Sequence, residues 1–369
     1  MPVPVLHITS AHDPLDNRIY RKECHALSDA GFDVTLLAPH LRDGYVFEGP
    51  VRVRTFRPAG GRLTRFFGSS IRMWRIVVRE NPLVLHAHDP ELIPLVILYK
   101  LFRPSTRIVY DAHEDLPDQV AGKDYIPAAI RPLVGLACVA LLQLVNRASD
   151  IVVVATPAIA RRFTPGKVTL VQNFPMASDF ESQTDDFATY TLSFVGGLNK
   201  IRGGHELIAA LKLVDGASCV MAGGLSDDLK PVASKSPQVH HLGNVPAGEV
   251  GKVIGQGLAG VVTFLPLPNH IESQPTKLFE YMASGRPVIC SDFPLWREIL
   301  EPVGCAYFVD PTSSESIASA IRQVMSEPEI AIEKGRQARK AFESRFSFES
   351  EAARLVGSYK ASLEVGNPV

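Results

Sequence analysis

The stretch LSFVGGLNKIRGGHELIAALKL, residues 192–213, decides the fold. Its first four residues are mostly apolar, as in a buried strand, and two glycines follow them. Residues 204–213 then have the apolar spacing of an amphipathic helix. A buried strand that turns through glycine into a helix is the repeating unit of a parallel sheet covered by helices.

The same alternation extends through the chain in both directions. In the first half, the predicted strands are residues 3–9, 34–38, 51–56, 83–86, 107–111, 151–155 and 168–171. In the second half, they are residues 192–195, 217–222, 239–242, 260–264 and 287–291, after which only helices are expected. Among the intervening helices we expect one at 17–30, capped by Asp16, and a buried one at 130–146.

These elements predict an α/β fold of two tandem doubly wound, Rossmann-like domains with an interdomain cleft at the carboxyl ends of both sheets, where such folds bind ligands. The acidic, aperiodic segment around residues 175–188 separates them. We therefore expect an N-terminal domain at 1–175, a linker at 176–190 and a C-terminal domain at 191–345. A last helix at 346–369 is expected to pack back on the N-terminal domain.

Composition narrows the class of protein. The 369 residues are 46% hydrophobic and 21% charged, which excludes a disordered or collagen-like chain. Five scattered cysteines without a Cys-x-x-Cys pair argue against disulfides or a zinc cluster. The longest apolar stretch, residues 133–145, is shorter than the roughly 20 residues that span a bilayer. No secretory signal is recognisable at the N-terminus, so we expect a cytoplasmic location.

Positive charge is concentrated in one segment. Eight arginines lie between Arg52 and Arg79, interleaved with aromatic residues, and they include Arg62, Arg65 and Arg72. Such a segment suits a phosphate-bearing partner or peripheral contact with an anionic membrane. The alternative is a solvated helix face, and both remain open. No nucleic-acid-binding module is present, so no nucleic-acid partner is expected.

The second half contains an expected anion site. Pro275 and Thr276 stand where a helix should begin, so that uncapped backbone N–H groups would face a ligand. Lys277 places a cation in the first turn, which the helix dipole disfavours unless an anion is near. Glu280, one turn later, can accept paired hydrogen bonds from a diol. Glu272 precedes this helix in a loop.

A second glycine-rich turn adds to this site. Gly196 and Gly197 end a strand and let a ligand approach the backbone, while Lys200 and Arg202 bring positive charge. An ordinary βα turn remains the alternative. The Gly-x-Gly-x-x-Gly fingerprint is absent, which disfavours a nicotinamide cofactor.

Histidines mark the carboxyl ends of strands in the first half. His113 follows a strand, in the position of a ligand-binding or proton-transferring residue, although a surface histidine is the alternative. His86 and His88 point the same way along their strand. The sequence identifies no third metal ligand beside them, and no Asp-x-Asp motif occurs, so we expect no metal.

Over nearly its whole length the chain resembles the retaining glycosyltransferases of family 4, which have the GT-B fold. The resemblance is strongest in residues 272–292, in residues 194–204, and in the pair HAHDPEL (86–92) and YDAHED (110–115). The branch that makes bacterial capsule and other surface polysaccharides is the most similar. The resemblance implies metal-independent, cofactor-free transfer of a sugar from a UDP- or GDP-type nucleotide sugar to a saccharide or lipid-linked acceptor, with the enzyme on the inner face of the cytoplasmic membrane or free in the cytoplasm.

The resemblance also assigns roles to residues. His113 and Glu272 would act on the donor sugar as the catalytic pair, and Glu280 would bind the ribose. Gly197 stands where the family has an arginine and Arg202 where it has a lysine, so Lys277 is the substitute charge. The rest of the donor site would be Gly196, Lys200, Asn244, Val245, Pro275, Thr276 and Leu278. The acceptor or membrane side would be Asp16, Arg18, His88, Arg62, Arg65 and Arg72.

Two alternatives to a transferase stay open. A non-hydrolysing nucleotide-sugar 2-epimerase would bind the same ligand in the same cleft. A catalytically inactive nucleotide-sugar-binding subunit would be consistent with glycine at position 197.

Overall fold

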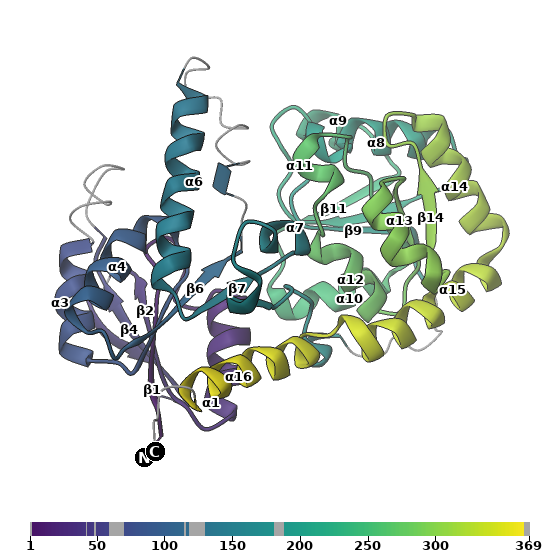
Figure 1. Ribbon diagram of the computed structural model, residues 1–369. Coiled ribbons are helices and arrows are strands. Elements are labelled where there is room, and N and C mark those ends of the chain that lie inside the picture. The colour runs from purple at the N-terminus through teal and green to yellow at the C-terminus, as the bar shows by residue number, and fades with distance from the viewer. Residues whose placement is uncertain are drawn as a thin grey trace. The chain divides into compact units, whose positions relative to one another are not determined.

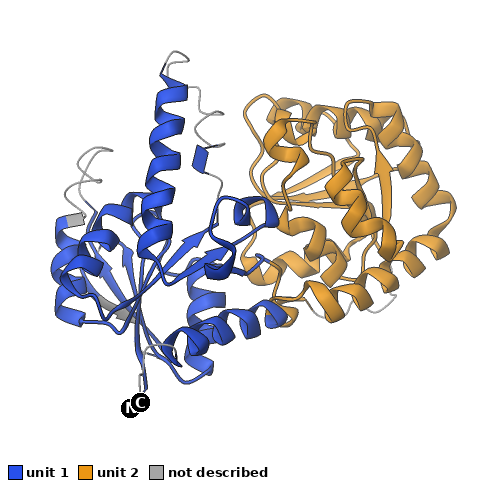
Figure 2. Ribbon diagram, viewed as in Figure 1, with its two compact units in different colours: residues 1–173, 349–369 blue, residues 174–348 orange. Residues whose placement is uncertain are grey.

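The computed structural model describes residues 2–41, 43–47, 49–58, 70–113, 116–117, 130–180 and 188–364. The chain forms two compact units, one of residues 1–173 with 349–369 and one of residues 174–348 (Figure 2). Each unit has its own sheet and its own apolar core. The predicted fold of two tandem Rossmann-like domains is confirmed. The cleft between them stays a prediction.

Unit 1 is built on an eight-stranded sheet in the order β3-β4-β2-β1-β5-β6-β7-β8. All neighbouring strands are parallel except β3 and β4. The strands are β1 (Pro4–Ile8), β2 (Asp33–Pro39), β3 (Gly44–Phe47), β4 (Val51–Phe56), β5 (Val84–Ala87), β6 (Arg107–Ala112), β7 (Ile151–Val154) and β8 (Val168–Leu170).

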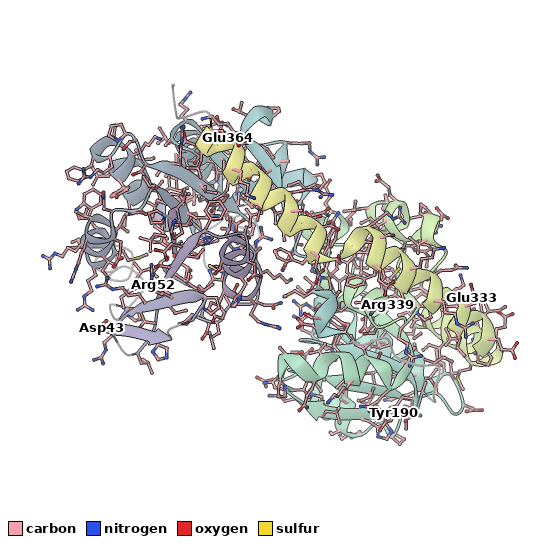
Figure 3. All side chains as sticks on the ribbon, turned by 90° about the horizontal axis from the view of Figure 1, so that it is seen from below. Asp43, Arg52, Tyr190, Glu333, Arg339 and Glu364 are labelled. Carbon is pink, nitrogen blue, oxygen red and sulfur yellow. The ribbon has the colours of Figure 1, made fainter. Side chains whose placement is uncertain are left out.

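Helices cover both faces of this sheet (Figure 1). They are η1 (Ile19–Cys24), α1 (His25–Asp29), α3 (Ser70–Glu80), η3 (Pro90–Leu92), α4 (Ile93–Phe102), α6 (Arg131–Ala148), α7 (Pro157–Ala160), η4 (Pro165–Lys167) and α16 (Phe348–Glu364). Helices α3, α4 and α6 pack on one face through an apolar core that includes Met73, Val77 and Val145. On the other face, the ring of Tyr359 from α16 lies against Phe32 and His86. Figure 3 shows α16 ending at Glu364.

The two-residue period of the strands gives the two faces of unit 1 different chemistry. In β1, Leu6 and Ile8 enter the core under α3, α4 and α6, whereas His7 is buried on the opposite face. In β5, Leu85 and Ala87 enter that core, and His86 is buried opposite. The second face of unit 1 is therefore buried and polar.

Unit 2 has a six-stranded parallel sheet in the order β11-β10-β9-β12-β13-β14. Its strands are β9 (Tyr190–Val195), β10 (Cys219–Ala222), β11 (Val239–Gly243), β12 (Gly257–Val262), β13 (Val288–Ser291) and β14 (Ala306–Val309). Its helices are η5 (Ala177–Asp179), η6 (Lys200–Arg202), α8 (Gly204–Lys212), α9 (Lys230–Ser234), η7 (Ala247–Glu249), α10 (Val250–Gly255), α11 (Pro268–Ile271), α12 (Thr276–Ala283), α13 (Pro294–Leu300), η8 (Glu301–Val303), α14 (Ser314–Ser326), α15 (Pro328–Ala341) and η9 (Phe342–Phe346).

Two strands were missed, and two predicted helices differ from the expectation. The sequence analysis missed strands β3 and β14, both only four residues long. The helix expected at 17–30 begins as the π-helix η1, although the carboxylate of Asp16 does cap it, accepting the N–H groups of Arg18 and Ile19 at 2.8 Å.

The prediction that α6 is a buried helix was wrong for its N-terminal part. Leu142 and Val145 are buried, but Leu133 and Leu136 are 68% and 65% exposed, and Val139 is also exposed. Figure 1 shows this end of α6 extending beyond the sheet of unit 1. Among the described residues, no helix combines the length and the apolar character that crossing a membrane requires.

Candidate functional site

Glycines line the carboxyl edge of the sheet in unit 2. Gly196, Gly223 and Gly243 end three neighbouring strands, and all three have positive φ. A Cβ on Gly223 would lie 2.3 Å from the carbonyl oxygen of Gly196, and the N–H of Gly223 donates to the carbonyl of Gly243 at 2.7 Å. This edge therefore has no side chains of its own at these positions, and a ligand can approach the backbone.

Lys277 brings a buried cation to this edge. It lies in the first turn of α12 with 7% of its surface exposed, and its Nζ lies 4.1 Å from the ring centroid of Phe194. Among the described residues, nothing accepts a hydrogen bond from this Nζ. Burial, with a contribution from Arg202, lowers the pKa of Lys277 to about 7. An unpartnered, desolvated ammonium at a ligand-binding edge is an incomplete anion site.

Arg202 stands on the other side of the two glycines. A Cβ on Gly196 would lie 3.4 Å from Nζ of Lys277, and one on Gly197 would lie 3.3 Å from a guanidinium nitrogen of Arg202. That guanidinium also donates to the carbonyl of Gly197 at 2.7 Å. The structure thus brings together the predicted residues Gly196, Gly197, Lys277 and Arg202.

The start of α12 contributes backbone donors to the same region. Its N-cap residue is Pro275, whose side chain has no hydrogen-bond acceptor, so the first N–H groups, from Thr276 onward, have no side-chain cap. Glu280 lies one turn after Lys277 on the same helix, and its carboxylate favours the charged form of that lysine. Glu272 is exposed at the C-terminus of α11, where Trp296 holds the following loop by donating to the carbonyl of Ser273 at 2.7 Å.

The other predicted donor residues occupy different environments. Asn244 and Val245 follow β11 directly, beside the glycine edge. Lys200 is exposed in η6. Leu278 is fully buried in the apolar core, and its N–H donates to the carbonyl of Pro275. The side chain of Leu278 therefore packs in the core, and its place among the donor contacts stays a prediction.

In unit 1, His113 lies at the carboxyl end of β6, backed by a buried ion pair. Its Nδ1 is 3.3 Å from a carboxylate oxygen of Asp111, and its side chain is 18% exposed. Burial would raise the pKa of Asp111, but Arg18 and the two histidines His88 and His113 outweigh burial and hold it well below its ordinary value. The ionised Asp111 can therefore orient His113, as an orienting carboxylate does for a catalytic imidazole.

Arg18 and His88 support Asp111 from inside the protein. Arg18 donates to both oxygens of Asp111, at 2.8 and 3.1 Å, and Nδ1 of His88 lies 3.1 Å from that carboxylate. Both side chains are buried, and Asp16 is engaged in helix capping. Arg18 and His88 thus lie behind His113, and the assignment of Asp16, Arg18 and His88 to the acceptor side stays a prediction.

Sequence reasoning missed the pair His12 and Asp89. Nδ1 of His12 lies 3.0 Å from Asp89, and its ring is 5.1 Å from the ring of His113. The bond to Asp89 raises the pKa of His12, and His12 in turn, against burial, lowers the pKa of Asp89 to about 2. Asp89 lies two residues after β5 and His12 lies four residues after β1, both in loops at the carboxyl ends of strands, so the rule that identified His113 could have found them.

The arginine-rich segment is only partly described. Arg62 and Arg65 lie outside the described residues. On β4, Arg52 (labelled in Figure 3) lies 2.8 Å from the carboxylate of Asp33, and Arg54 forms an ion pair with Glu80. Arg72 is exposed on α3 and donates to the carbonyl of Arg57.

Two family models match the chain, one in each half. Residues 17–174 match the model described as "Glycosyltransferase Family 4", and residues 179–341 match the one described as "Glycosyl transferases group 1". No curated protein matches the chain by sequence.

Solved structures with the same fold cover nearly the whole chain. Sucrose-phosphate synthase from Thermosynechococcus elongatus superposes with a TM-score of 0.76 at 17% identity, covering 98% of this chain and 100% of that one. Anabaena HepE in complex with UDP gives 0.72 at 13% identity, with 97% and 100% covered. The catalytic domain of starch synthase IV from Arabidopsis thaliana, bound to ADP and acarbose, gives 0.67 at 13%, with 99% and 100% covered. At these identities the likeness shows a shared fold, the two-domain GT-B fold.

Proposed function

We propose, from the premise that this chain is a GT-B glycosyltransferase with a family 4 domain followed by a group 1 domain, that it transfers a sugar from a nucleoside-diphosphate sugar to a hydroxyl group with retention of configuration. Anabaena HepE, of the same fold, has been crystallised with UDP and with UDP-glucose, which supports a nucleotide sugar as the donor. The observation that carries the proposal is the unpartnered Nζ of Lys277 beside Gly196.

The chemistry of sugar transfer explains why such a cation is useful. When the bond between the anomeric carbon and the diphosphate oxygen breaks, the leaving nucleoside diphosphate gains negative charge. Lys277, Arg202 and the N-terminus of α12 are fixed in position before the reaction, so they stabilise this charge more in the transition state than in the ground state. In a retaining reaction the leaving phosphate can take the proton of the acceptor hydroxyl on the same face of the sugar, and no pair of carboxylates is required.

The remaining assignments follow from position and from the resemblance. We assign Glu280 to the ribose hydroxyls, Asn244 and Val245 to the base, and Glu272 and His113 to the transferred sugar. His113, whose Nδ1 lies 3.3 Å from the ionised Asp111, is a partly exposed imidazole of unit 1 that can hydrogen-bond a sugar hydroxyl. The acceptor would be a saccharide or a lipid-linked saccharide, with surface polysaccharide as the product.

A donor labelled in its sugar distinguishes transfer from the alternatives. We expect the label to move to an added acceptor with the anomeric configuration of the donor, as read by NMR coupling constants. Conversion of the donor to its 2-epimer without acceptor would favour the epimerase, and binding without any product would favour an inactive subunit. Both family models describe glycosyltransferases, which favours the first outcome.

We expect the transfer reaction to need no added divalent ion. The two cations and the helix N-terminus supply the positive charge that Mg²⁺ would otherwise bring to a diphosphate. Initial rates measured in excess EDTA should equal those measured with Mg²⁺ or Mn²⁺, to within about twofold. Activity that is lost in EDTA and restored by Mg²⁺ or Mn²⁺ would contradict this expectation.

Unit 1 has a surface suited to peripheral contact with an anionic membrane. Helix α4 exposes Leu98, Leu101 and Phe102, and α6 exposes Leu133 and Leu136. This apolar surface adjoins α3, where the ring of Trp74 lies 5.9 Å from that of Phe102 and the arginines at 72, 75 and 79 are exposed. Apolar side chains beside exposed arginines match an interfacial lipid layer with anionic headgroups.

Vesicle sedimentation tests this surface. The protein should pellet with vesicles that contain phosphatidylglycerol but not with purely zwitterionic ones, and rising salt should weaken binding. Charge reversal of Arg72 and Arg75 together should reduce binding by at least about 30-fold, since each basic residue contributes roughly 1 kcal/mol near such a surface and losing two already costs about 2 kcal/mol. Reversal of Arg322 and Arg336 in unit 2 is the control. Vesicle binding that is unchanged by charge reversal on α3 would mean that these arginines form only a solvated helix face.

A further inference from the structure

Four buried side chains meet on the polar face of the sheet in unit 1. They are His7 from β1, His86 and His88 from β5 and the residue after it, and Glu23 from η1. All four side chains are fully buried. One nitrogen or oxygen atom from each lies within 4.8 Å of the corresponding atoms of the other three. The sequence analysis saw only His86 and His88 and therefore found no third ligand. The folded chain brings two more groups to the same point.

Hydrogen bonds on one side of the cluster fix how its histidines are protonated. The carboxylate of Asp111, paired with Arg18, accepts from Nδ1 of His88 at 3.1 Å. In a neutral imidazole the other nitrogen is then an acceptor, so Nε2 of His88 accepts from Nδ1 of His7 at 2.9 Å. The same rule leaves Nε2 of His7 with a lone pair, and this atom has no hydrogen-bond partner among the described residues.

Two more side chains of the cluster, His86 and Glu23, have atoms without a hydrogen-bond partner among the described residues. The hydroxyl of Tyr359 holds Nδ1 of His86 at 2.7 Å, and Nε2 of His86 has no partner in the described part of the chain. Neither carboxylate oxygen of Glu23 accepts a hydrogen bond there either, although Nε of Arg18 lies 3.1 Å from Oε1. Oε2 of Glu23 is 3.9 Å from Nε2 of His86, too far for a hydrogen bond.

We propose that His7, His86 and Glu23 bind one divalent transition-metal ion, of the zinc class, in the interior of unit 1. Two imidazole nitrogens and a carboxylate oxygen are the ligands that Zn²⁺ takes in proteins, and bonds of about 2.0–2.2 Å place tetrahedral ligands roughly 3.3 Å apart. The observed separations of up to 4.8 Å close to that value if each ligand moves by less than about 1 Å. His88 serves as a hydrogen-bond partner of the site, since both of its nitrogens are already engaged, with Asp111 and with His7.

The surroundings of the cluster are those of a metal site. Histidine ligands are usually held through their second nitrogen, and here Tyr359 holds His86, while His88 and Asp111 hold His7 in series. The ion would join β1, β5 and η1, and through Tyr359 also α16. It would thus be a structural ion, separate from the diphosphate site of unit 2, and it would stabilise the elements that position Asp111 behind His113.

Metal analysis of the full-length protein tests the proposal. Protein purified without chelators should contain about one equivalent of zinc-class metal per chain. After chelation and reloading with Co²⁺, it should show the visible absorption of cobalt in a nitrogen- and oxygen-ligated tetrahedral site. Addition of one equivalent of Zn²⁺ to the chelated protein should raise its Tm by several degrees, because the ion binds only the folded state.

Variants locate the ion. Glu23→Gln and His86→Gln should each lose at least about nine-tenths of the metal, whereas His270→Gln should keep it, since His270 is a buried histidine of unit 2 outside the cluster. If these variants fail to fold, the wild-type measurements still decide. Wild-type protein that holds less than about 0.1 equivalent of metal and shows no change of Tm with Zn²⁺ or Co²⁺ would overturn the proposal. The histidines and Glu23 would then share only a proton. Full metal content in folded Glu23→Gln and His86→Gln would overturn it as well.

Discussion

Replacing Lys277 with methionine lowers kcat by about 100-fold or more while the folded protein becomes no less stable. Loss of one preorganised donor to a developing negative charge typically costs about 10²–10³ in rate. The ammonium is buried without a hydrogen-bond partner, so in the ligand-free protein it is a destabilising group. Methionine fills similar space without charge, and the Tm should therefore stay equal or rise. A residue that served only the fold would show the reverse pattern.

Two further variants define this result. Lys212→Met, at the exposed end of α8, removes a lysine that lies outside the glycine edge and should leave both kcat and Tm unchanged. Arg202→Ala should lower kcat at least about tenfold, since its guanidinium flanks Gly197. Near-normal turnover in both Lys277→Met and Arg202→Ala would refute the role of these two cations.

Affinity for the nucleoside diphosphate falls more than about tenfold as the pH rises from 7 to 9. In the free protein the pKa of Lys277 is about 7, well below its ordinary value, because burial and Arg202 disfavour the charge. A bound diphosphate favours the ammonium, so binding above pH 7 must take up a proton, and each further pH unit weakens binding up to tenfold. The terminal phosphate, with a second pKa of about 6, is already largely ionised at pH 7, so its own titration contributes little in this range.

Calorimetry in two buffers of different ionisation enthalpy measures that proton directly. At pH 8.5 the wild-type protein should take up about one proton per diphosphate bound, and Lys277→Met should take up none. In the ligand-free protein the same lowered pKa has the opposite effect on pH dependence, because folding releases a proton from Lys277 whereas ligand binding takes one up. Its contribution to stability therefore increases as the pH rises from about 7 towards 10.5. Wild-type binding that is independent of pH between 7 and 9 would contradict the proposed role of Lys277.

Periodicity predicted most of the fold because the strands are buried on both faces. The segment at residues 151–154 is a continuous apolar run and the one at 107–112 has an apolar centre; such runs between helices are distinctive in a sequence. Strand β14 is short and half-buried, and β3 lies at the edge of its sheet, so neither has that signature. The apolar sequence of α6 predicts burial, yet what covers a helix depends on its neighbours in space.

The donor site could be predicted further than the histidine cluster. Lys277, Gly196 and Arg202 each belong to a local pattern, a helix start or a glycine turn, and such patterns can be read from neighbouring residues. The lack of a partner for Lys277 could not, because it depends on Phe194 and Phe264 enclosing the side chain. His7 meets His86 because β1 pairs with β5, some eighty residues away in sequence, and Glu23 reaches them from η1. No short sequence motif indicates that β1 and β5 pair in this register.

The most direct test of the account is a crystal structure of the protein with the nucleoside diphosphate that raises its Tm most among UDP, GDP, ADP and TDP. The account predicts diphosphate oxygens within hydrogen-bonding distance of Nζ of Lys277 and of the N-terminal N–H groups of α12, with no metal ion between phosphate and protein. A diphosphate bound elsewhere, or held through a divalent ion while Lys277 stays without a partner, would contradict it.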